Sequence, residues 1–278
     1  WSSLVGSEMC IRDRLYINDV QRGVLSICRK FGYELVVHPC DMQSETLIHE
    51  AVSFVNRSKL DGVIILPPIS ENNDLAGALG NANVNYVRLA SIALDTARHV
   101  VISNERSAAA AMAEHLVKLG HRRIGYISGP PRMRSTRERL EGFCDALEKH
   151  GCKPDDDMIA LGAYTFESGI ECTRKLLANA NPPTVIFASN DEMAVGAINA
   201  AQDMGLKVPQ DLSVAGFDDS ILASRIMPPL TTIRRPVQEM ARHAATKLIA
   251  SIDGRDDEAD VSIILVPELV KRASTRPI

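Results

Sequence analysis

A chain of 278 residues is long for a single hydrophobic core, and it fits either one large α/β domain or two lobes of ordinary size. Its hydrophobic content of 45% and charged content of 24% are ordinary for a globular protein and exclude extensive disorder. The net charge of −4 excludes nucleic-acid binding by bulk electrostatics, because domains that bind in this way are strongly basic. If the protein acts on DNA, the DNA-contacting part lies elsewhere.

The cysteines and the hydropathy pattern indicate the compartment. The six cysteines form no CxxC pair, so we expect reduced thiols, with neither a disulfide framework nor a zinc site. No apolar run approaches the roughly 18 residues of a membrane span, and no secretory apolar segment precedes the first predicted element. We therefore expect a cytoplasmic protein that makes no membrane contact. The cysteines are Cys10, Cys28, Cys40, Cys144, Cys152 and Cys172.

Residues 1–14 are atypical of the rest of the chain. They show neither strand alternation nor a helical stripe, and the chain starts with Trp1 instead of Met. The segment resembles translated sequencing-adapter sequence. We interpret it as foreign to the native protein, and the chain as a fragment.

From residue 19 onward, apolar helical stripes alternate with short β-branched runs. Unbroken apolar runs are typical of strands buried on both faces of a parallel sheet, so the pattern predicts an α/β fold with helices on both faces of each sheet. The alternation restarts near Ser103, where we expect a second lobe to begin. The predicted elements are helix 19–31, strand 33–38, helix 44–56, strand 62–66, helix 75–79, strand 84–89, strand 100–102, helix 107–119, strand 123–128, helix 136–150, helix 164–179, strand 184–189, helix 192–202, strand 213–217, extended segment 230–233, helix 236–252 and strand 261–266.

Polar residues follow two of these strands directly. Asn190 and Asp191 follow strand 184–189, and Asp218 and Asp219 follow the next strand. Because ligands of open α/β sheets bind beyond the carboxyl ends of the strands, these residues indicate a binding site. The alternative is that they only cap the following turns and helices, with Asp191 as the N-cap of helix 192–202.

Catalytic and metal-binding motifs are missing from the sequence. It contains no GxGxxG, GxxxxGK[ST], GxSxG or HExxH, and no paired nucleophile and base, so we predict no enzyme, no catalytic residue and no cofactor. His121 has no carboxylate or Cys at a ligand spacing, which favours a structural role over a metal site.

Several segments, in this order and at this spacing, together resemble the LacI/GalR (lactose-repressor) family of transcriptional regulators over about residues 19–276. The resemblance implies the effector-binding core, a two-lobed fold similar to periplasmic sugar-binding proteins, with lobes 15–102 plus 237–262 and 103–236 plus 263–278. The matching segments are DGVI at 61–64, LGHRRI at 119–124, ERLEGF at 138–143, ASNDEMA at 188–194, VPQDLSV at 208–214, GFDD at 216–219 and PPLTTI at 228–233.

The chain departs from the family pattern at its beginning. The N-terminal helix-turn-helix and hinge helix of family members are absent from this chain, and the atypical residues 1–14 stand where the first strand of the core is expected. The resemblance therefore implies operator DNA as a partner only through a domain outside this sequence, and it leaves the first lobe without one strand.

The resemblance also implies the effector contacts. Ser135 and Arg139 lie one turn apart on a predicted helix, and family members use the matching Arg to contact the effector. A guanidinium provides a rigid fork of donors for adjacent hydroxyls, although Arg139 could also be a solvated charge in a basic run. Asn190 and Asp218 match further contacts, and Tyr164 matches the aromatic position that stacks on the ligand.

Other residues are expected to line the cleft between the lobes. They are Pro67, Ala90, Ile102 and Arg235, with Pro68 beside the first of them. Some sugar-binding members have an acidic residue near Ala90, and its absence leaves the ligand class open.

The leading hypothesis is the ligand-sensing and dimerisation core of a LacI-type regulator that binds a sugar or sugar derivative. The rival is a periplasmic sugar-binding protein of a transport system.

Family members dimerise through both lobes, so we expect a homodimer in which helix 19–31 and residues 66–79 meet the partner. For that helix, Val20, Val24, Ile27 and Phe31 would form one apolar face, and Ile17, Leu25 and Cys28 would extend onto another, unless all of them belong to the core.

Overall fold

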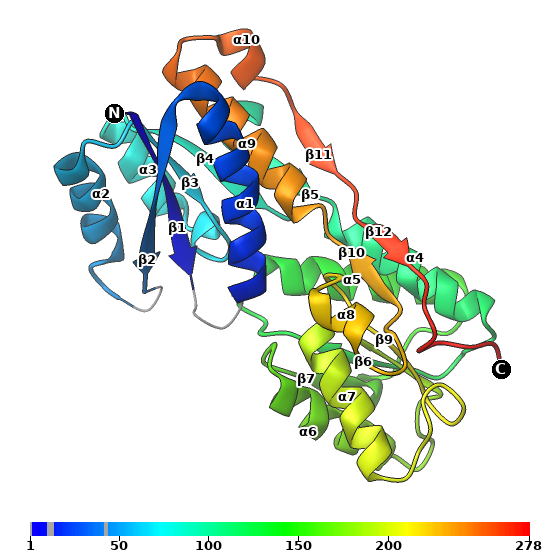
Figure 1. Ribbon diagram of the computed structural model, residues 1–278. Coiled ribbons are helices and arrows are strands. Elements are labelled where there is room, and N and C mark those ends of the chain that lie inside the picture. Colours follow the sequence, from blue (N-terminus) through cyan, green and yellow to red (C-terminus); the bar gives the residue numbers. More distant parts are fainter. Residues whose placement is uncertain (1, 10–13, 42–43) are drawn as a thin grey trace. The chain divides into compact units, whose positions relative to one another are not determined.

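The computed structural model describes residues 2–9, 14–41 and 44–278 of the chain (Figure 1). The chain forms two compact units and passes between them three times. Unit 1 consists of Trp1–Ser103 and Pro236–Leu265, and unit 2 of Asn104–Arg235 and Val266–Ile278.

Unit 1 contains a six-stranded sheet in which every pair of neighbouring strands is parallel. The strand order is β11-β5-β4-β3-β1-β2, so the last strand of the unit in sequence forms one edge. The strands are β1 (Ser2–Met9), β2 (Tyr33–Cys40), β3 (Gly62–Ile65), β4 (Asn85–Ala90), β5 (Val100–Ser103) and β11 (Ile263–Leu265).

Helices cover both faces of this sheet. Alternate residues of β3 point to opposite cores: Ile64 packs in the core beneath α1 and α9, whereas Val63 and Ile65 pack in the core beneath α2 and α3. This arrangement explains why β3 is apolar without alternation. The helices are α1 (Arg14–Phe31), α2 (Leu47–Ser58), α3 (Asn73–Asn81), α9 (Val237–Ile252) and α10 (Asp256–Ala259), with single 3-10 turns at Ile69–Glu71 and Ala97–His99.

Strand β1 corrects the sequence prediction for residues 1–14. Its backbone pairs with β2 on one side and with β3 on the other, in the register Leu4↔Leu35 and Leu4↔Gly62. The expectation that the first lobe lacks a strand was therefore wrong. A strand with neighbours on both sides is held by main-chain hydrogen bonds of two ladders, and these do not require an alternating sequence.

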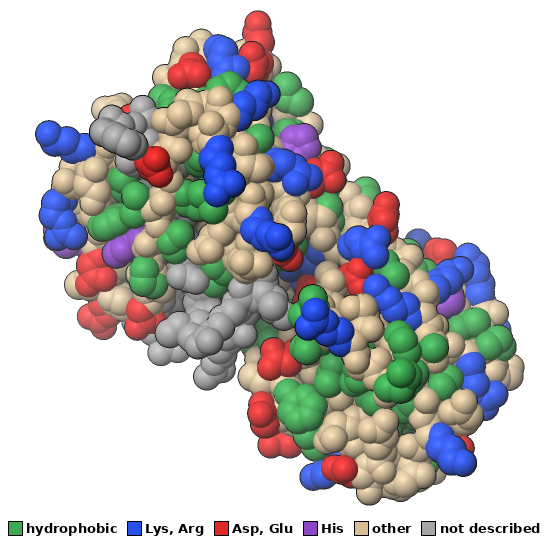
Figure 2. All heavy atoms as spheres, viewed as in Figure 1, with side chains coloured by type: hydrophobic (Ala, Val, Ile, Leu, Met, Phe, Trp, Pro, Cys, Tyr) green, Lys and Arg blue, Asp and Glu red, His purple; other side chains and the backbone are tan. Residues whose placement is uncertain are grey.

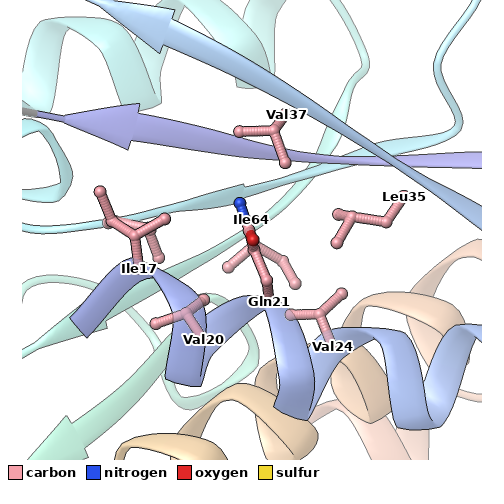
Figure 3. Close-up of a pocket in the computed structure, with 8 residues that line it drawn as sticks. Ile17, Val20, Gln21, Val24, Leu35, Val37 and Ile64 are labelled. Carbon is pink, nitrogen blue, oxygen red and sulfur yellow. The ribbon is translucent and has the colours of Figure 1, made fainter. Parts of the chain in front are cut away.

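Helix α1 packs against both the sheet and α9 within unit 1. Its backbone approaches α9 so closely at Gly23 that a Cβ there would lie 2.4 Å from the Gln238 carbonyl oxygen. Ile17 and Cys28, which were expected to extend toward a partner chain, are buried in the unit, while Leu25 is half-buried and Phe31 is 39% exposed. Ile17 lies on the sheet-facing side with Val20 and Val24, and Cys28 belongs to the same core as these two valines, so the predicted division into two faces is wrong for both residues. Figure 3 shows the sheet-facing side of α1, with Ile17, Val20 and Val24 near Leu35, Val37 and Ile64.

Unit 2 contains a four-stranded parallel sheet with the order β7-β6-β8-β9 and a separate antiparallel pair, β10 and β12. The pair continues from the main sheet through a parallel bridge between Ala215 and Thr231. The strands are β6 (Ile124–Ser128), β7 (Ile159–Leu161), β8 (Val185–Ala188), β9 (Ser213–Ala215), β10 (Thr232–Arg234) and β12 (Glu268–Val270).

The helices of unit 2 again lie on both faces of the sheet. Val185 and Phe187 of β8 pack in the core with α4 and α5, and Ile186 and Ala188 pack in the core with α6 and α7. The predicted α/β class, with parallel sheets flanked by helices, is confirmed. Strands β7 and β12 and helices α8 and α10, of three to five residues each, were not predicted. The helices are α4 (Glu105–Lys118), α5 (Arg134–Lys149), α6 (Phe166–Leu177), α7 (Asp191–Asp203) and α8 (Ile221–Arg225), with a 3-10 turn at Asp156–Met158.

Charges of both signs are interspersed on the face of each unit that Figure 2 shows, in keeping with the slightly acidic net charge.

Within the described residues, no helix combines the length and apolar character needed to cross a membrane. Cys10 lies outside the described residues. The described cysteines with free thiols are Cys28, Cys40, Cys144, Cys152 and Cys172.

Candidate ligand-binding site

Each strand of the unit 2 sheet is followed, at its carboxyl end, by one of the predicted effector contacts. Tyr164 follows β7, Asn190 follows β8 and Asp218 follows β9, while β6 leads into α5, which carries Ser135 and Arg139. The carboxyl ends of parallel strands lie at one edge of a sheet, so the topology collects these residues at a single edge.

Four charged side chains form ion pairs with one another at this edge. We call them the charged cluster: Glu105, Arg139, Asp218 and Arg235. Glu105 lies at the start of α4 and is 1% exposed. Its two carboxylate oxygens are held by Arg139 Nε at 2.7 Å and by Arg235 Nη2 at 3.0 Å. Asp218 Oδ1 lies 3.4 Å from Arg235 Nη1 and 3.8 Å from Arg139 Nη2. Opposite charges therefore alternate around the cluster.

Within this cluster, the opposite charges counteract the effect of burial on Glu105 and Arg139. Burial raises the pKa of Glu105, but Arg139 and then Arg235 outweigh it, so the pKa lies below its ordinary value. Burial lowers the pKa of Arg139, but the attraction of Glu105 together with Tyr164 and Asp218 outweighs it, and the pKa is raised. Desolvation of buried charges offsets their mutual attraction, so apolar side chains in these positions would stabilise the fold at least as well. Stability alone therefore does not explain the charged cluster.

Aromatic rings flank the guanidinium of Arg139. Its Cζ lies 4.0 Å from the ring centroid of Phe217 and 6.0 Å from that of Tyr164. Tyr164 has a φ of +62°, and its hydroxyl lies 2.7 Å from the hydroxyl of Thr136 on α5. A bulky residue with positive φ is uncommon and persists where surrounding contacts hold it. The Tyr164 ring also lies where a Cβ of residue 129 would be, so any larger residue than Gly129 would displace the ring.

Asn190, not Asp191, is the N-cap of α7, so the sequence prediction on this point was wrong. Asn190 has the extended backbone that a cap needs, and its Oδ1 accepts from the Met193 amide at 2.9 Å. Its Nδ2 donates to the Tyr164 carbonyl at 3.2 Å. The side-chain amide of Asn190 has two N–H donors and two acceptor sites on its oxygen. These two hydrogen bonds use one donor and one acceptor site.

Asp191 is the first residue of the helix and is 1% exposed. Its Oδ1 accepts from the Thr232 hydroxyl at 2.5 Å, and its Oδ2 accepts from the Ser220 amide at 2.6 Å. Burial and then the charge of Asp218 raise the pKa of Asp191 to about 8, against the hydrogen bonds from Thr232 and Ser220, which lower it.

The remaining predicted residues lie in both units. Ser135 is half-buried in the first turn of α5, one turn before Arg139. Within unit 1, Pro67 follows β3, and Ala90 of β4 is paired in register with Ile102 of β5, so these three also lie toward the carboxyl edge of their own sheet. Arg235, predicted only to line the cleft, belongs to the charged cluster.

Sequence reasoning missed Glu105 and Phe217. Glu105 follows Asn104 directly after a strand, as Asp191 follows Asn190, and Asn104 caps α4 by accepting from the Ser107 amide. This repeated Asn-acid pair after a strand is a signal that could have identified Glu105. Phe217 carries no such signal, because an apolar residue beside a buried strand is expected to be core.

Two further predictions concern other chemistry. His121 is buried, with Nδ1 2.8 Å from the Thr184 hydroxyl and Nε2 3.2 Å from the Arg276 carbonyl. These contacts join the segment after α4 to the residue before β8 and to the C-terminal segment, which is a structural role. In the part of the chain that the structure describes, no group of His, Cys, Asp and Glu side chains is arranged to hold a metal ion.

Comparisons with known proteins bear on both units. Residues 113–275 match the domain described as "Periplasmic binding protein-like domain". The chain is 33% identical over 268 residues to the HTH-type transcriptional regulator DegA of Bacillus subtilis (strain 168), covering 95% of this chain and 78% of DegA. It is 32% identical over 272 residues to the HTH-type transcriptional repressor CytR of Escherichia coli (strain K12), covering 94% and 76%. The structure of the transcriptional regulator CelR–cellobiose complex matches with a TM-score of 0.88 and 27% identity, covering 98% of this chain and 84% of that chain.

The two-unit fold and the polar site beyond the strand ends define a periplasmic-binding-protein-like, ligand-sensing core. The chain belongs to the LacI family of transcriptional regulators. Its relatives are regulators of transcription, which favours this class over the rival transport-binding protein. The resemblance noted from the sequence is confirmed.

Proposed function

We propose that the chain senses a neutral sugar or sugar derivative through Arg139, Tyr164, Asn190 and Asp218. The observation that carries this proposal is the buried charged cluster. Arg139 Nη2 lies 3.8 Å from Asp218, an ion pair beyond hydrogen-bond reach, while the Asp218 side chain is 23% exposed. Donors of a guanidinium beside an accessible carboxylate suit the adjacent hydroxyls of a sugar. The two Arg and two acidic side chains balance in charge, which favours a neutral ligand.

Further parts of the proposal follow from the family. The chain spans 78% of DegA and 76% of CytR, which are HTH-type regulators, so we propose that operator DNA is bound through a helix-turn-helix outside this sequence. A regulator of this kind acts in the cytoplasm and without enzymatic activity. We also propose a homodimer. Its contact through α1 would rest on Leu25 and Phe31, because the other apolar residues of that helix are largely covered.

The first test is a calorimetric titration of the protein with ribose, glucose and cellobiose, of which the tightest binder becomes the reference sugar. We expect Asp218→Asn to weaken binding of the reference sugar by about 10-fold to 100-fold, since hydrogen bonds to charged groups are worth about 1.5–3 kcal/mol. The substitution keeps the shape of the side chain and removes its charge. Asp203→Asn on the exposed end of α7 is the matched control and should leave the affinity unchanged.

Two results would contradict the proposal. Equal affinities of wild-type protein and Asp218→Asn would remove Asp218 from the site. Failure of the wild-type protein to bind any neutral sugar, together with binding of an anionic metabolite, would exclude the neutral ligand class.

A further inference from the structure

Asp218 stands on an unusual turn. Asp218 has a φ of +118° and Asp219 a φ of +54°, so two consecutive residues other than glycine lie at positive φ. Each such residue costs roughly 1–3 kcal/mol and persists only where neighbouring contacts hold it. The structure of this turn, residues 216–220, is therefore set by what surrounds it.

One side chain reaches the turn from α7. The Asp191 carboxyl accepts from the Ser220 amide at 2.6 Å and from the Thr232 hydroxyl at 2.5 Å. Thr232 Oγ1 in turn lies 3.4 Å from the Asp219 amide, which donates to it. Asp191 thus holds the turn at Ser220 by a direct hydrogen bond, and at Asp219 through the hydroxyl of Thr232. It also fits against Gly216, where a Cβ would lie 2.5 Å from Asp191 Oδ1.

Other contacts fix the turn from different directions. The Asp218 amide donates to the Ile233 carbonyl at 2.8 Å, and the Asp219 carboxylate pairs with Arg234 at 2.7 Å and Arg272 at 2.6 Å. These groups hold the turn at the β10 side. Asp191 connects the turn by hydrogen bonds to α7, the helix that Asn190 caps.

We infer that Asp191 is a positioning residue, which holds the turn 216–220 so that Asp218 presents its carboxylate to the ligand beside Asn190. The inference rests on the proposed function, in which Asp218 binds the sugar. Asp191 itself is buried behind the turn and does not contact the ligand. Both of its oxygens act as acceptors, so an Asn side chain can replace only one of them unchanged, whereas Ala replaces neither.

The test compares Asp191→Ala and Asp191→Asn with the wild-type protein. We expect Asp191→Ala to weaken binding of the reference sugar by about tenfold, the equivalent of one lost hydrogen bond, and Asp191→Asn to weaken it less. Hydrogen–deuterium exchange should show faster exchange of the Asp219 and Ser220 amides in Asp191→Ala. Leu176→Ala, in the core of the same unit and 1% exposed, is the control for general destabilisation and should leave both readouts unchanged below its melting temperature.

The outcomes separate the inference from the proposed function. If the wild-type protein binds no sugar, the proposed function fails, and the exchange measurement alone decides whether Asp191 holds the turn. If the wild-type protein binds sugar and Asp191→Ala binds it equally well, the inference is overturned while the function stands. Should Asp191→Ala fail to fold, Thr232→Val removes one of the two hydrogen bonds with little change of shape. Unchanged affinity and unchanged exchange in that variant would then reject the inference.

Discussion

Replacing Arg139 by Ala should lower the free energy of unfolding by about 3–5 kcal/mol and abolish sugar binding. The substitution leaves the buried Glu105 with Arg235 as its only cation in the charged cluster. It also removes the donor to the Ser189 carbonyl. Breaking a buried ion pair by removing one partner is costly because the remaining charge stays desolvated. Urea denaturation followed by circular dichroism measures the stability, and the titration described above measures the affinity.

The matched control is Arg137→Ala, which removes an exposed guanidinium from the same helix and should change the stability by no more than about 0.5 kcal/mol. A stability of Arg139→Ala equal to that of the control would show that the charged cluster is not buried in solution. From the sequence alone, the same substitution is expected to spare the fold, because Arg139 then counts only as a ligand contact. Because Arg139 also pairs with the buried Glu105 and donates to the Ser189 carbonyl, its loss is instead expected to destabilise the fold.

The difference between these expectations shows which features a sequence can reveal. The stripe and motif around Arg139 predict a helix and a role for the guanidinium, and both are local properties. Glu105 lies 34 positions before Arg139, and Arg235 lies 96 positions after it, so the contacts of Glu105 with these two arginines depend on how α4, α5 and β10 pack. No periodicity in the sequence contains that information.

Strand β1 and helix α1 illustrate two further limits. Residues 2–9 form a strand because β2 and β3 offer ladders on both sides, although their own pattern is poor. For α1, the helix was predicted, but its division into two apolar faces was not borne out, because Ile17 and Cys28 pack in the core with Val20 and Val24. That core includes residues of α9, which lies more than two hundred residues away in sequence. Strands β6, β8 and β9 of unit 2 were predictable, because their apolar runs alternate with helical stripes along the chain.

Gly142→Ala should have the second large effect, because this residue sets how closely α5 approaches α4. A Cβ at position 142 would lie 2.1 Å from the carbonyl oxygen of Arg106, a backbone atom that cannot rotate away. Relief of the clash requires the two helices to separate, and overpacking of this kind typically costs about 1–3 kcal/mol.

The consequence for the site is direct. Gly142 lies three residues after Arg139 on α5, and Arg106 follows Glu105 on α4, so the close contact stands about one turn from the 2.7 Å bond between Arg139 and Glu105. Separating the helices lengthens this bond, and we expect the affinity for the reference sugar to fall by about tenfold together with the stability. The motif ERLEGF at 138–143 thus joins the guanidinium to the glycine that brings it to its partner.

The control for Gly142→Ala is Gly77→Ala on α3, where an added Cβ meets nothing within 4 Å. That substitution should raise the free energy of unfolding by about 0.5–1 kcal/mol, since Ala is favoured over Gly inside a helix. Urea denaturation of both variants measures the contrast, and titration with the reference sugar measures its effect on the site. If Gly142→Ala gains stability as Gly77→Ala does and binds the sugar normally, α4 and α5 do not pack at this distance in solution, and the geometry of the charged cluster would have to be set in another way.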